Sequence, residues 1–217
     1  MKKMWRHIKW TALTFLTTVV FGAVAISLYI LFAPQFGAQP KGKYLVTIST
    51  SQHYQSGQFV NLVETVLEHG YANTAKTIRD FLTVENISPT GPIPVKFAQS
   101  TQLLADTLTT VTWYGHSAFL VKMEGKRILL DPMFGPVASP FSFVGQRYTY
   151  QHPIDLEQFT DIDAVIVSHD HYDHLDYPSI IRLKPHVGHF VVPLGLAAHL
   201  MHWGVAEARS PNWIGGK

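Results

Sequence analysis

The feature that most constrains this chain is a run of ionisable residues, HDHYDH at positions 169–174, directly after an apolar segment. In an extended loop, residues two apart point the same way, so His169 and His171 are expected to face one metal ion. A bend after His171 would let Asp173 and His174 bind a second ion. The alternative is a solvent-exposed polar loop without function, but four potential ligands within six residues favour a metal site.

The absence of cysteine limits which ligands this site can use. None of the 217 residues is cysteine, so a metal site must be built from His, Asp, Glu and water. Imidazole nitrogen and carboxylate oxygen bind Zn²⁺ at about 2.0–2.2 Å, and the available side chains therefore predict zinc. Two such ions about 3.5–4 Å apart can stabilise both the attacking and the leaving oxygen of a displacement reaction.

Charge is unevenly distributed along the chain. The formal net charge is +2, from 17 Lys and Arg against 15 Asp and Glu. Four of the basic residues precede residue 10, namely Lys2, Lys3, Arg6 and Lys9. The remaining chain is nearly neutral, which argues against a nucleic-acid-binding surface.

The segment 10–33 contains no Asp, Glu, Lys or Arg. A helix of this length rises roughly 36 Å at about 1.5 Å per residue, enough to cross a hydrocarbon core of about 30 Å. We therefore predict a transmembrane anchor at 10–33 behind a cytoplasmic basic tail at 1–9, with residues 34–217 outside the cytoplasm (periplasmic in a bacterium). A cleavable signal peptide and a buried core helix are the alternatives.

The rest of the chain separates into two regions. Residues 34–109 are predicted to be a tether with short packing helices near 59–67 and 72–82. Residues 110–217 read as alternating strands and helices, which indicates an α/β architecture. The expected strands are 110–114, 118–123, 127–130, 163–168 and 189–192, and the expected helices are 178–183 and 194–202. Residues 210–217 are not expected to form a strand.

Several motifs resemble one family. The run at 169–174 resembles the HxHxDH signature of the metallo-β-lactamase superfamily. The motifs WYGHS at 113–117, LDPMF at 130–134, ASP at 138–140 and VPLG at 192–195 resemble its N-acyl-phosphatidylethanolamine-hydrolysing phospholipase D group. The ascorbate-6-phosphate lactonase branch is similar but more distant. The resemblance implies a four-layer αββα fold and a zinc-activated hydroxide that hydrolyses a phosphodiester.

The resemblance also implies roles for individual residues. His169, His171, Asp173 and His174 correspond to metal ligands, and we take Asp173 as the catalytic residue. Asp131 resembles an acidic position near the metals, where its carboxylate would accept an imidazole N–H and fix the tautomer of a ligand; a plain turn-capping role is its alternative. For His116, two roles are open: it could support a metal ligand from outside the ligand set, or it could make a purely structural hydrogen bond. Asp176 is expected to cap the helix that follows it.

Three functions are compatible with this pattern. The first is a membrane-anchored zinc phosphodiesterase acting on a membrane lipid or a small phosphodiester. The second is a lactonase or another metallo-hydrolase with a soluble substrate. The third is an inactive truncated fragment, because the family pattern requires further ligands and only 43 residues follow His174. Such a fragment would keep the N-terminal half of the sandwich and leave Val165 and Val167 exposed. The oligomeric state is left open.

Overall fold

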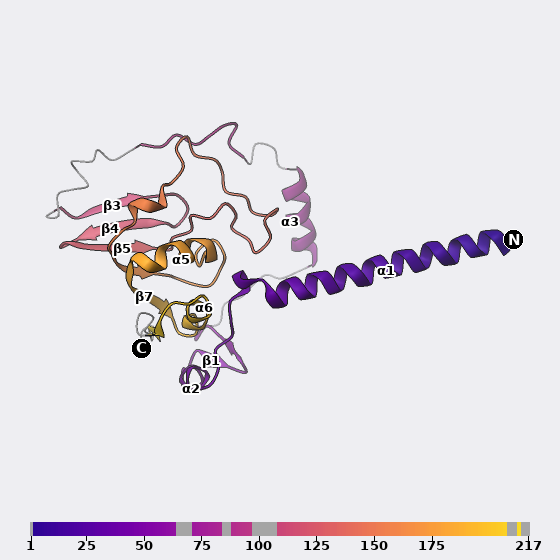
Figure 1. Ribbon diagram of the computed structural model, residues 1–217, viewed down its shortest axis with the longest axis horizontal. Helices are drawn as coiled ribbons and strands as arrows, with labels where there is room; N and C mark the ends of the chain where they lie inside the picture. Colours follow the sequence, from indigo (N-terminus) through magenta and orange to yellow (C-terminus); the bar gives the residue numbers. More distant parts are fainter. Residues whose placement is uncertain (1, 64–70, 84–87, 97–107, 208–211, 214–217) are drawn as a thin grey trace. The chain divides into compact units, whose positions relative to one another are not determined.

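The computed structural model describes residues 2–63, 71–83, 88–96, 108–207 and 212–213. The chain divides into two compact units, Met1–Gly37 and Ala38–Lys217. Figure 1 labels the main helices and strands of the two units.

The first unit is one long helix, α1 (Lys2–Phe32), followed by the short 3-10 helix Pro34–Phe36. None of the residues of α1 is buried. The hydroxyl groups of Thr14, Thr17 and Thr18 each donate to a carbonyl oxygen of the preceding turn, so these polar side chains are satisfied within the helix. By length and composition α1 could cross a membrane, although a signal sequence would have the same properties.

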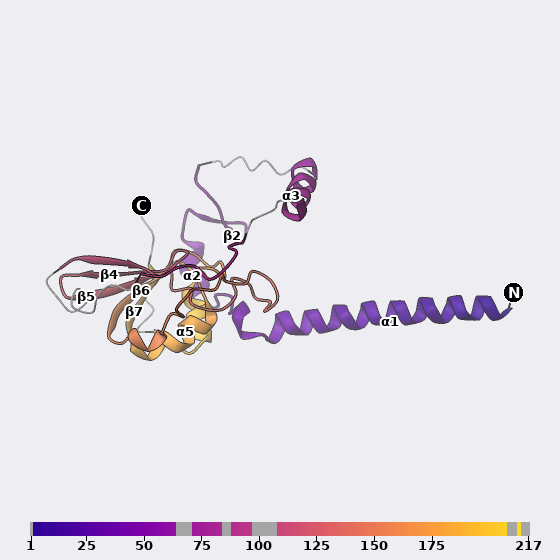
Figure 2. The ribbon, with the colours of Figure 1, turned by 90° about the horizontal axis from the view of Figure 1, so that it is seen from above.

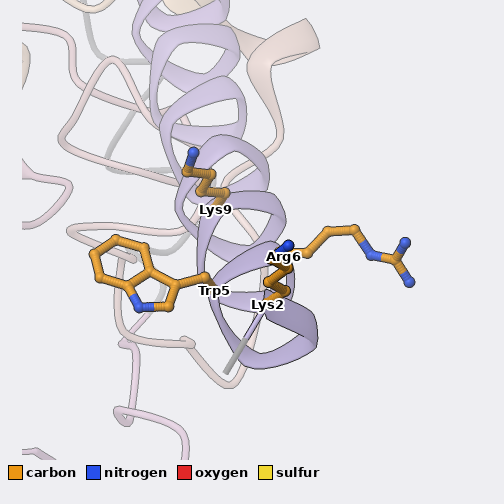
Figure 3. Close-up of a pocket in the computed structure, with 4 residues that line it drawn as sticks. All are labelled: Lys2, Trp5, Arg6 and Lys9. Carbon is orange, nitrogen blue, oxygen red and sulfur yellow. The ribbon is translucent and has the colours of Figure 1, made fainter.

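The helix begins earlier than predicted. The four basic residues, expected to form a separate tail, lie within its first turns because Lys and Arg are good helix formers. A shallow depression on this part of the helix is lined by Lys2, Trp5, Arg6 and Lys9, which come from its first turns (Figure 3). Cationic side chains and an indole ring therefore share this end of α1.

The second unit is built on a six-stranded mixed sheet with the order β3-β4-β5-β6-β7-β8. The pairs β3–β4 and β4–β5 are antiparallel, whereas the pairs from β5 to β8 are parallel. Figure 2 shows the strands edge-on, with α5 against one face of the sheet. The strands are β3 (Thr110–Trp113), β4 (Phe119–Met123), β5 (Lys126–Leu130), β6 (Ile162–Ile166), β7 (Val187–Pro193) and β8 (Asn212–Trp213).

Local sequence explains most of these boundaries. Glu124 and Gly125 both have positive φ (51° and 72°), as a two-residue hairpin turn between β4 and β5 requires. The helix α5 (Tyr177–Leu183) begins after Asp176, whose carboxylate accepts the Ser179 N–H at 3.1 Å. The same carboxylate accepts the Gly135 N–H at 2.9 Å. The predicted cap is thus confirmed, and it also ties the loop after β5 to α5.

The core lies between the sheet and two helices, α5 and α6 (Ala197–His202). Leu129, Val165 and Phe190 are fully buried neighbours on β5, β6 and β7. Val165 and Val167 are 0% and 2% exposed, so the expectation that they would be exposed is wrong. The helices α5 and α6 supply the apolar side chains, such as Ile180, that cover them.

The structure decides three other predictions, at residues 210–217, 59–67 and 72–82. Asn212 and Trp213 form β8, which pairs with the end of β7, so the prediction of no strand there is wrong. The helix predicted near 59–67 is wrong at its start, because Phe59 lies in the strand β2 (Gln58–Phe59), and positions 64–67 lie outside the described residues. The helix predicted near 72–82 is confirmed as α3 (Tyr71–Thr83).

The segment after the first unit packs on the sheet domain. It contains α2 (Lys43–Ser49) and a hairpin of β1 (Tyr54–Gln55) with β2. Ile48 is buried, and both Ile48 and Phe59 lie against Gly195 between β7 and α6. The Ala38 N–H donates to His199 Nδ1 at 3.1 Å. Residues 38–59 are therefore more firmly attached than a simple tether.

Candidate metal centre

The site is assembled where two parallel strands end side by side. Leu130 of β5 pairs with Ile166 of β6, and just beyond this pair hydrogen bonds join Asp131 to Ser168. The Ser168 N–H donates to Asp131 Oδ1 and its hydroxyl group donates to Asp131 Oδ2, both at 2.7 Å. Asp131 is buried and has a φ of 39°, an uncommon conformation that these contacts hold in place.

The histidine run folds back on itself directly after β6. The backbone N–H groups of His174 and Leu175 both donate to the carbonyl oxygen of His171, at 3.0 and 2.8 Å. This turn brings three imidazole rings together. The centroid of the His169 ring lies 4.6 Å from that of His171 and 4.0 Å from that of His174. His174 thus lies beside the pair expected to face one ion, and the division of ligands between two ions stays a prediction.

Hydrogen bonds orient two of these rings. His174 Nδ1 lies 2.9 Å from Asp131 Oδ2, and because an ionised carboxylate only accepts, Nδ1 carries the proton. His169 Nδ1 lies 2.9 Å from Ser168 Oγ, whose own proton goes to Asp131, so this Nδ1 also donates. These tautomers follow from the hydrogen-bond network. They leave the Nε2 lone pairs of both rings to bind a metal ion.

His116 joins the cluster from the turn after β3. Gly115 and His116 have positive φ values of 93° and 48°, in a turn closed by the hydrogen bonds Tyr114 N to Ala118 O and Ala118 N to Gly115 O. His116 Nε2 lies 2.9 Å from Asp173 Oδ2. One ligand atom from each of His116, Asp173 and His174 fits within 4.8 Å of the others. His116 therefore lies among the candidate ligands and in direct contact with one of them.

Electrostatics favour the protonation states that metal binding needs. Burial lowers the pKa of His169, and the neighbouring His174 and His171 lower it further, so its imidazole is neutral at pH 7. Burial alone would raise the pKa of Asp173. Hydrogen bonding to its own backbone and the nearby His174 and His116 outweigh burial, and the pKa lies below its usual value. The neutral imidazole of His169 and the ionised carboxylate of Asp173 are suitable ligands for a divalent cation.

Other histidines lie outside this cluster. His199 is on α6, where its Nδ1 accepts the Ala38 N–H, and burial lowers its pKa. His186 and His189 are exposed at the start of β7. Sequence reasoning did not single out Ser168 or Ser117, whose hydroxyl oxygens lie 3.3 and 3.2 Å from His174 Nδ1. The position of Ser168 at the end of a strand, just before the histidines, was the available signal.

Fold and cluster together define a metallo-β-lactamase-type domain. Residues 126–215 match the family model of the beta-lactamase superfamily domain. The fold is the metallo-β-lactamase fold with a mixed sheet and helices. Of the four-layer αββα arrangement, the described residues form one six-stranded sheet and the helices packed on it.

Similar proteins are found among bacteria, nematodes and archaea. An uncharacterized protein of Mycobacterium tuberculosis is 36% identical over 165 residues, which cover 73% of this chain and 43% of that protein. The N-acyl-phosphatidylethanolamine-hydrolyzing phospholipase D 1 of Caenorhabditis elegans is 41% identical over 97 residues, 43% of this chain and 27% of the relative. A metal-dependent hydrolase of Saccharolobus solfataricus is 34% identical over 95 residues, 43% of this chain and 36% of the relative. The chain thus spans less than half the length of these relatives.

Solved structures give more distant similarities. A diiron beta-hydroxylase from Streptomyces venezuelae has a TM-score of 0.37 and 20% identity, covering 47% of this chain and 20% of that one. An isothiocyanate hydrolase from Delia radicum gut bacteria has a TM-score of 0.38 and 21% identity, covering 48% of this chain and 41% of that one.

Proposed function

We propose that this chain carries the zinc site of a metal-dependent hydrolase that cleaves a phosphodiester bond in lipids resembling N-acyl-phosphatidylethanolamine. One observation carries the proposal: three imidazole rings and the Asp173 carboxylate converge beside Asp131, which hydrogen-bonds one of the rings. A cation would suit this group, because carboxylate oxygens and imidazole lone pairs all present negative charge to it.

The side chains present match zinc, which binds imidazole nitrogen and carboxylate oxygen. Bound there, zinc would polarise a phosphoryl oxygen and lower the pKa of a water molecule. Asp131 and Ser168 would hold His174 and His169 with their Nε2 atoms toward the ion. Asp173, ionised at neutral pH, would bind the metal and orient the attacking water through its carboxylate. His116, in contact with Asp173, would fix the direction of that carboxylate.

Two features support a substrate in a membrane. The nematode relative is by its name a phospholipase D that hydrolyses a membrane phospholipid. The second feature is an exposed apolar loop after β5: Phe143 is 77% exposed and Val144 is 48% exposed, with the Phe141 ring centroid 5.8 Å from that of Phe143. We further propose that α1 anchors the protein in the bilayer, with residues 34–217 outside the cytoplasm, and that this loop touches the lipid surface.

A second function is supported by the archaeal relative, which is by its name a metal-dependent hydrolase without an assigned lipid substrate. A hydrolase of a soluble ester or lactone would use the same ligands and differ only in the substrate. The two proposals therefore differ in substrate preference and agree on the need for metal.

The first prediction is a preference for phosphodiesters. The zinc-loaded chain is expected to hydrolyse N-acyl-phosphatidylethanolamine in mixed micelles and bis-(p-nitrophenyl) phosphate faster than any member of a lactone panel. The ratio between substrates is the informative quantity, because both proposed functions use the same metal ligands. The His171→Ala variant supplies the background. A lactone preference would favour the second function, and turnover equal to that of His171→Ala on every substrate would contradict both.

The second prediction concerns the apolar loop. The chain has no cysteine, so single cysteines can be introduced and labelled with an environment-sensitive fluorophore. In the full chain reconstituted in vesicles, a label at Phe143→Cys is expected to be quenched by nitroxide-bearing lipids. The matched control is Glu124→Cys, at the tip of the polar β4–β5 turn, where quenching is expected to be absent. Equal quenching at the two positions would exclude the loop as a specific lipid contact.

A further inference from the structure

Arg147 lies in the loop that follows β5 and hydrogen-bonds to two turns that carry residues of the metal centre. Its guanidinium Nη2 donates to the carbonyl oxygen of Tyr114 at 2.7 Å, and its Nη1 donates to the carbonyl oxygen of Met133. Nη1 also lies 3.4 Å from the Met133 sulfur. The side chain is half-buried, so these bonds are partly protected from water.

The two carbonyl groups belong to the two strained turns of the site. Tyr114 begins the turn that carries His116, and its neighbour Gly115 has a φ of 93°. Met133 closes the turn that carries Asp131, through a hydrogen bond from its N–H to the Asp131 carbonyl oxygen at 2.7 Å. One planar guanidinium therefore joins the turn of His116 to the turn of Asp131, using the fixed spacing of its two nitrogens.

Arg147 is itself held in position. Its backbone N–H donates to the Pro136 carbonyl oxygen at 2.9 Å, and its guanidinium carbon lies 5.1 Å from the centroid of the Tyr150 ring. The Tyr150 hydroxyl oxygen lies 3.5 Å from Nη2. This hydroxyl also fills the space beneath Gly115, where an added Cβ atom would come within 2.0 Å of it. The packing leaves little freedom for the guanidinium or for the turn above it.

We propose that Arg147 is a positioning residue of the metal centre, which sets the distance between His116 and Asp131 and so the directions of Asp173 and His174. His116 contacts Asp173, and Asp131 contacts His174, each at 2.9 Å. A shift of either turn would therefore move one member of the cluster of His116, Asp173 and His174 relative to the others. The inference rests on the proposed metal-binding function and adds to it a residue outside the ligand set.

The test compares two arginines whose guanidinium groups each donate to two backbone carbonyl oxygens. Arg127 also bonds two backbone carbonyl groups, those of Thr160 and Gln158, but on the far end of β5 from the metal centre. The variants Arg147→Lys and Arg127→Lys are titrated with Co²⁺ in the full chain, and the affinity and the d–d absorption bands are recorded beside the unfolding temperature. Lysine keeps the charge but cannot reach both carbonyl groups in a fixed geometry.

We expect Arg147→Lys to weaken Co²⁺ binding by about tenfold and to shift the absorption bands, since loss of a supporting residue typically costs 10–100-fold in metal affinity. Arg127→Lys should leave the Co²⁺ affinity and the absorption bands unchanged. It should lower the unfolding temperature about as much as Arg147→Lys does. If Arg147→Lys does not fold, Arg147→Gln is the second variant, with the same expectation. Unchanged affinity and spectrum in a folded Arg147 variant would overturn the inference. Failure of the parent chain to bind Co²⁺ would instead contradict the proposed function.

Discussion

Replacing His169 and His171 together by alanine is expected to abolish stoichiometric metal binding. The two rings lie 4.6 Å apart at their centroids and share the cluster with His174, so the double variant removes two of its three closely packed imidazoles. A catalytic zinc ion usually holds three protein ligands, and a site with one of these three would bind it weakly. Elemental analysis of the purified parent and variant chains measures the loss directly.

The matched control removes two histidines that lie outside the cluster. His186→Ala with His189→Ala changes two exposed residues of the same domain and should leave the zinc content unchanged. Metal content should also fall as the pH drops through the histidine range near 6.5, because protonated imidazole cannot bind a metal. The lowered pKa of His169 extends its neutral form to more acidic pH. Equal zinc in the double variant and the parent would show that the ions bind elsewhere.

The second large effect is expected from Asp131→Asn. Asparagine has nearly the same shape and tolerates the positive φ of 39° at this position, so the fold should be preserved. The variant loses the negative charge that accepts from His174 Nδ1 and from the Ser168 hydroxyl group. Supporting carboxylates of this kind typically contribute 10–100-fold to metal affinity, and we expect a loss in that range. Competition with a chelator measures it.

The control for this substitution is Asp163→Asn. Asp163 also accepts a backbone N–H, from Arg127 at 2.8 Å, and an additional side-chain donor, Lys126, but it lies at the opposite end of the strands. The control should leave the metal affinity unchanged. If Asp131→Asn binds zinc as tightly as the parent, Asp131 is a turn-capping residue, which is the simpler alternative for it.

Features determined by near neighbours in the chain could be predicted from the sequence. The Glu124-Gly125 turn and the Asp176 cap depend on residues within about three positions, so composition and spacing suffice. The uncharged run that forms most of α1 is a property of the sequence alone. The histidine run also belongs here, because four candidate ligands within six residues stay together whatever the rest of the chain does.

Features that depend on contacts between distant segments could not be predicted. The start of the helix expected near 59–67 was wrong for a local reason instead, because the turn at Ser56 and Gly57, both with positive φ, pairs β1 with β2 and places Phe59 in a strand. Val165 in β6 and Val167 just after it are buried because α5 and α6 cover them, which hydrophobic periodicity in this segment cannot indicate. The same holds for β8, whose two residues are a strand only through pairing with β7.

The site also combines features that are local in the sequence with contacts that exist only in the folded chain. The sequence by itself predicted a metal-binding run directly after an apolar segment, since spacing and residue type are local properties. Only the tertiary structure decided that His116 contacts Asp173 and that Asp131 contacts His174, because these pairs lie 57 and 43 positions apart. The parallel pairing of β5 with β6 brings Asp131 to the histidines, and the strained turn after β3 brings His116. A single arginine in a loop carries no sequence signal, and its link between those two turns exists only in the folded chain.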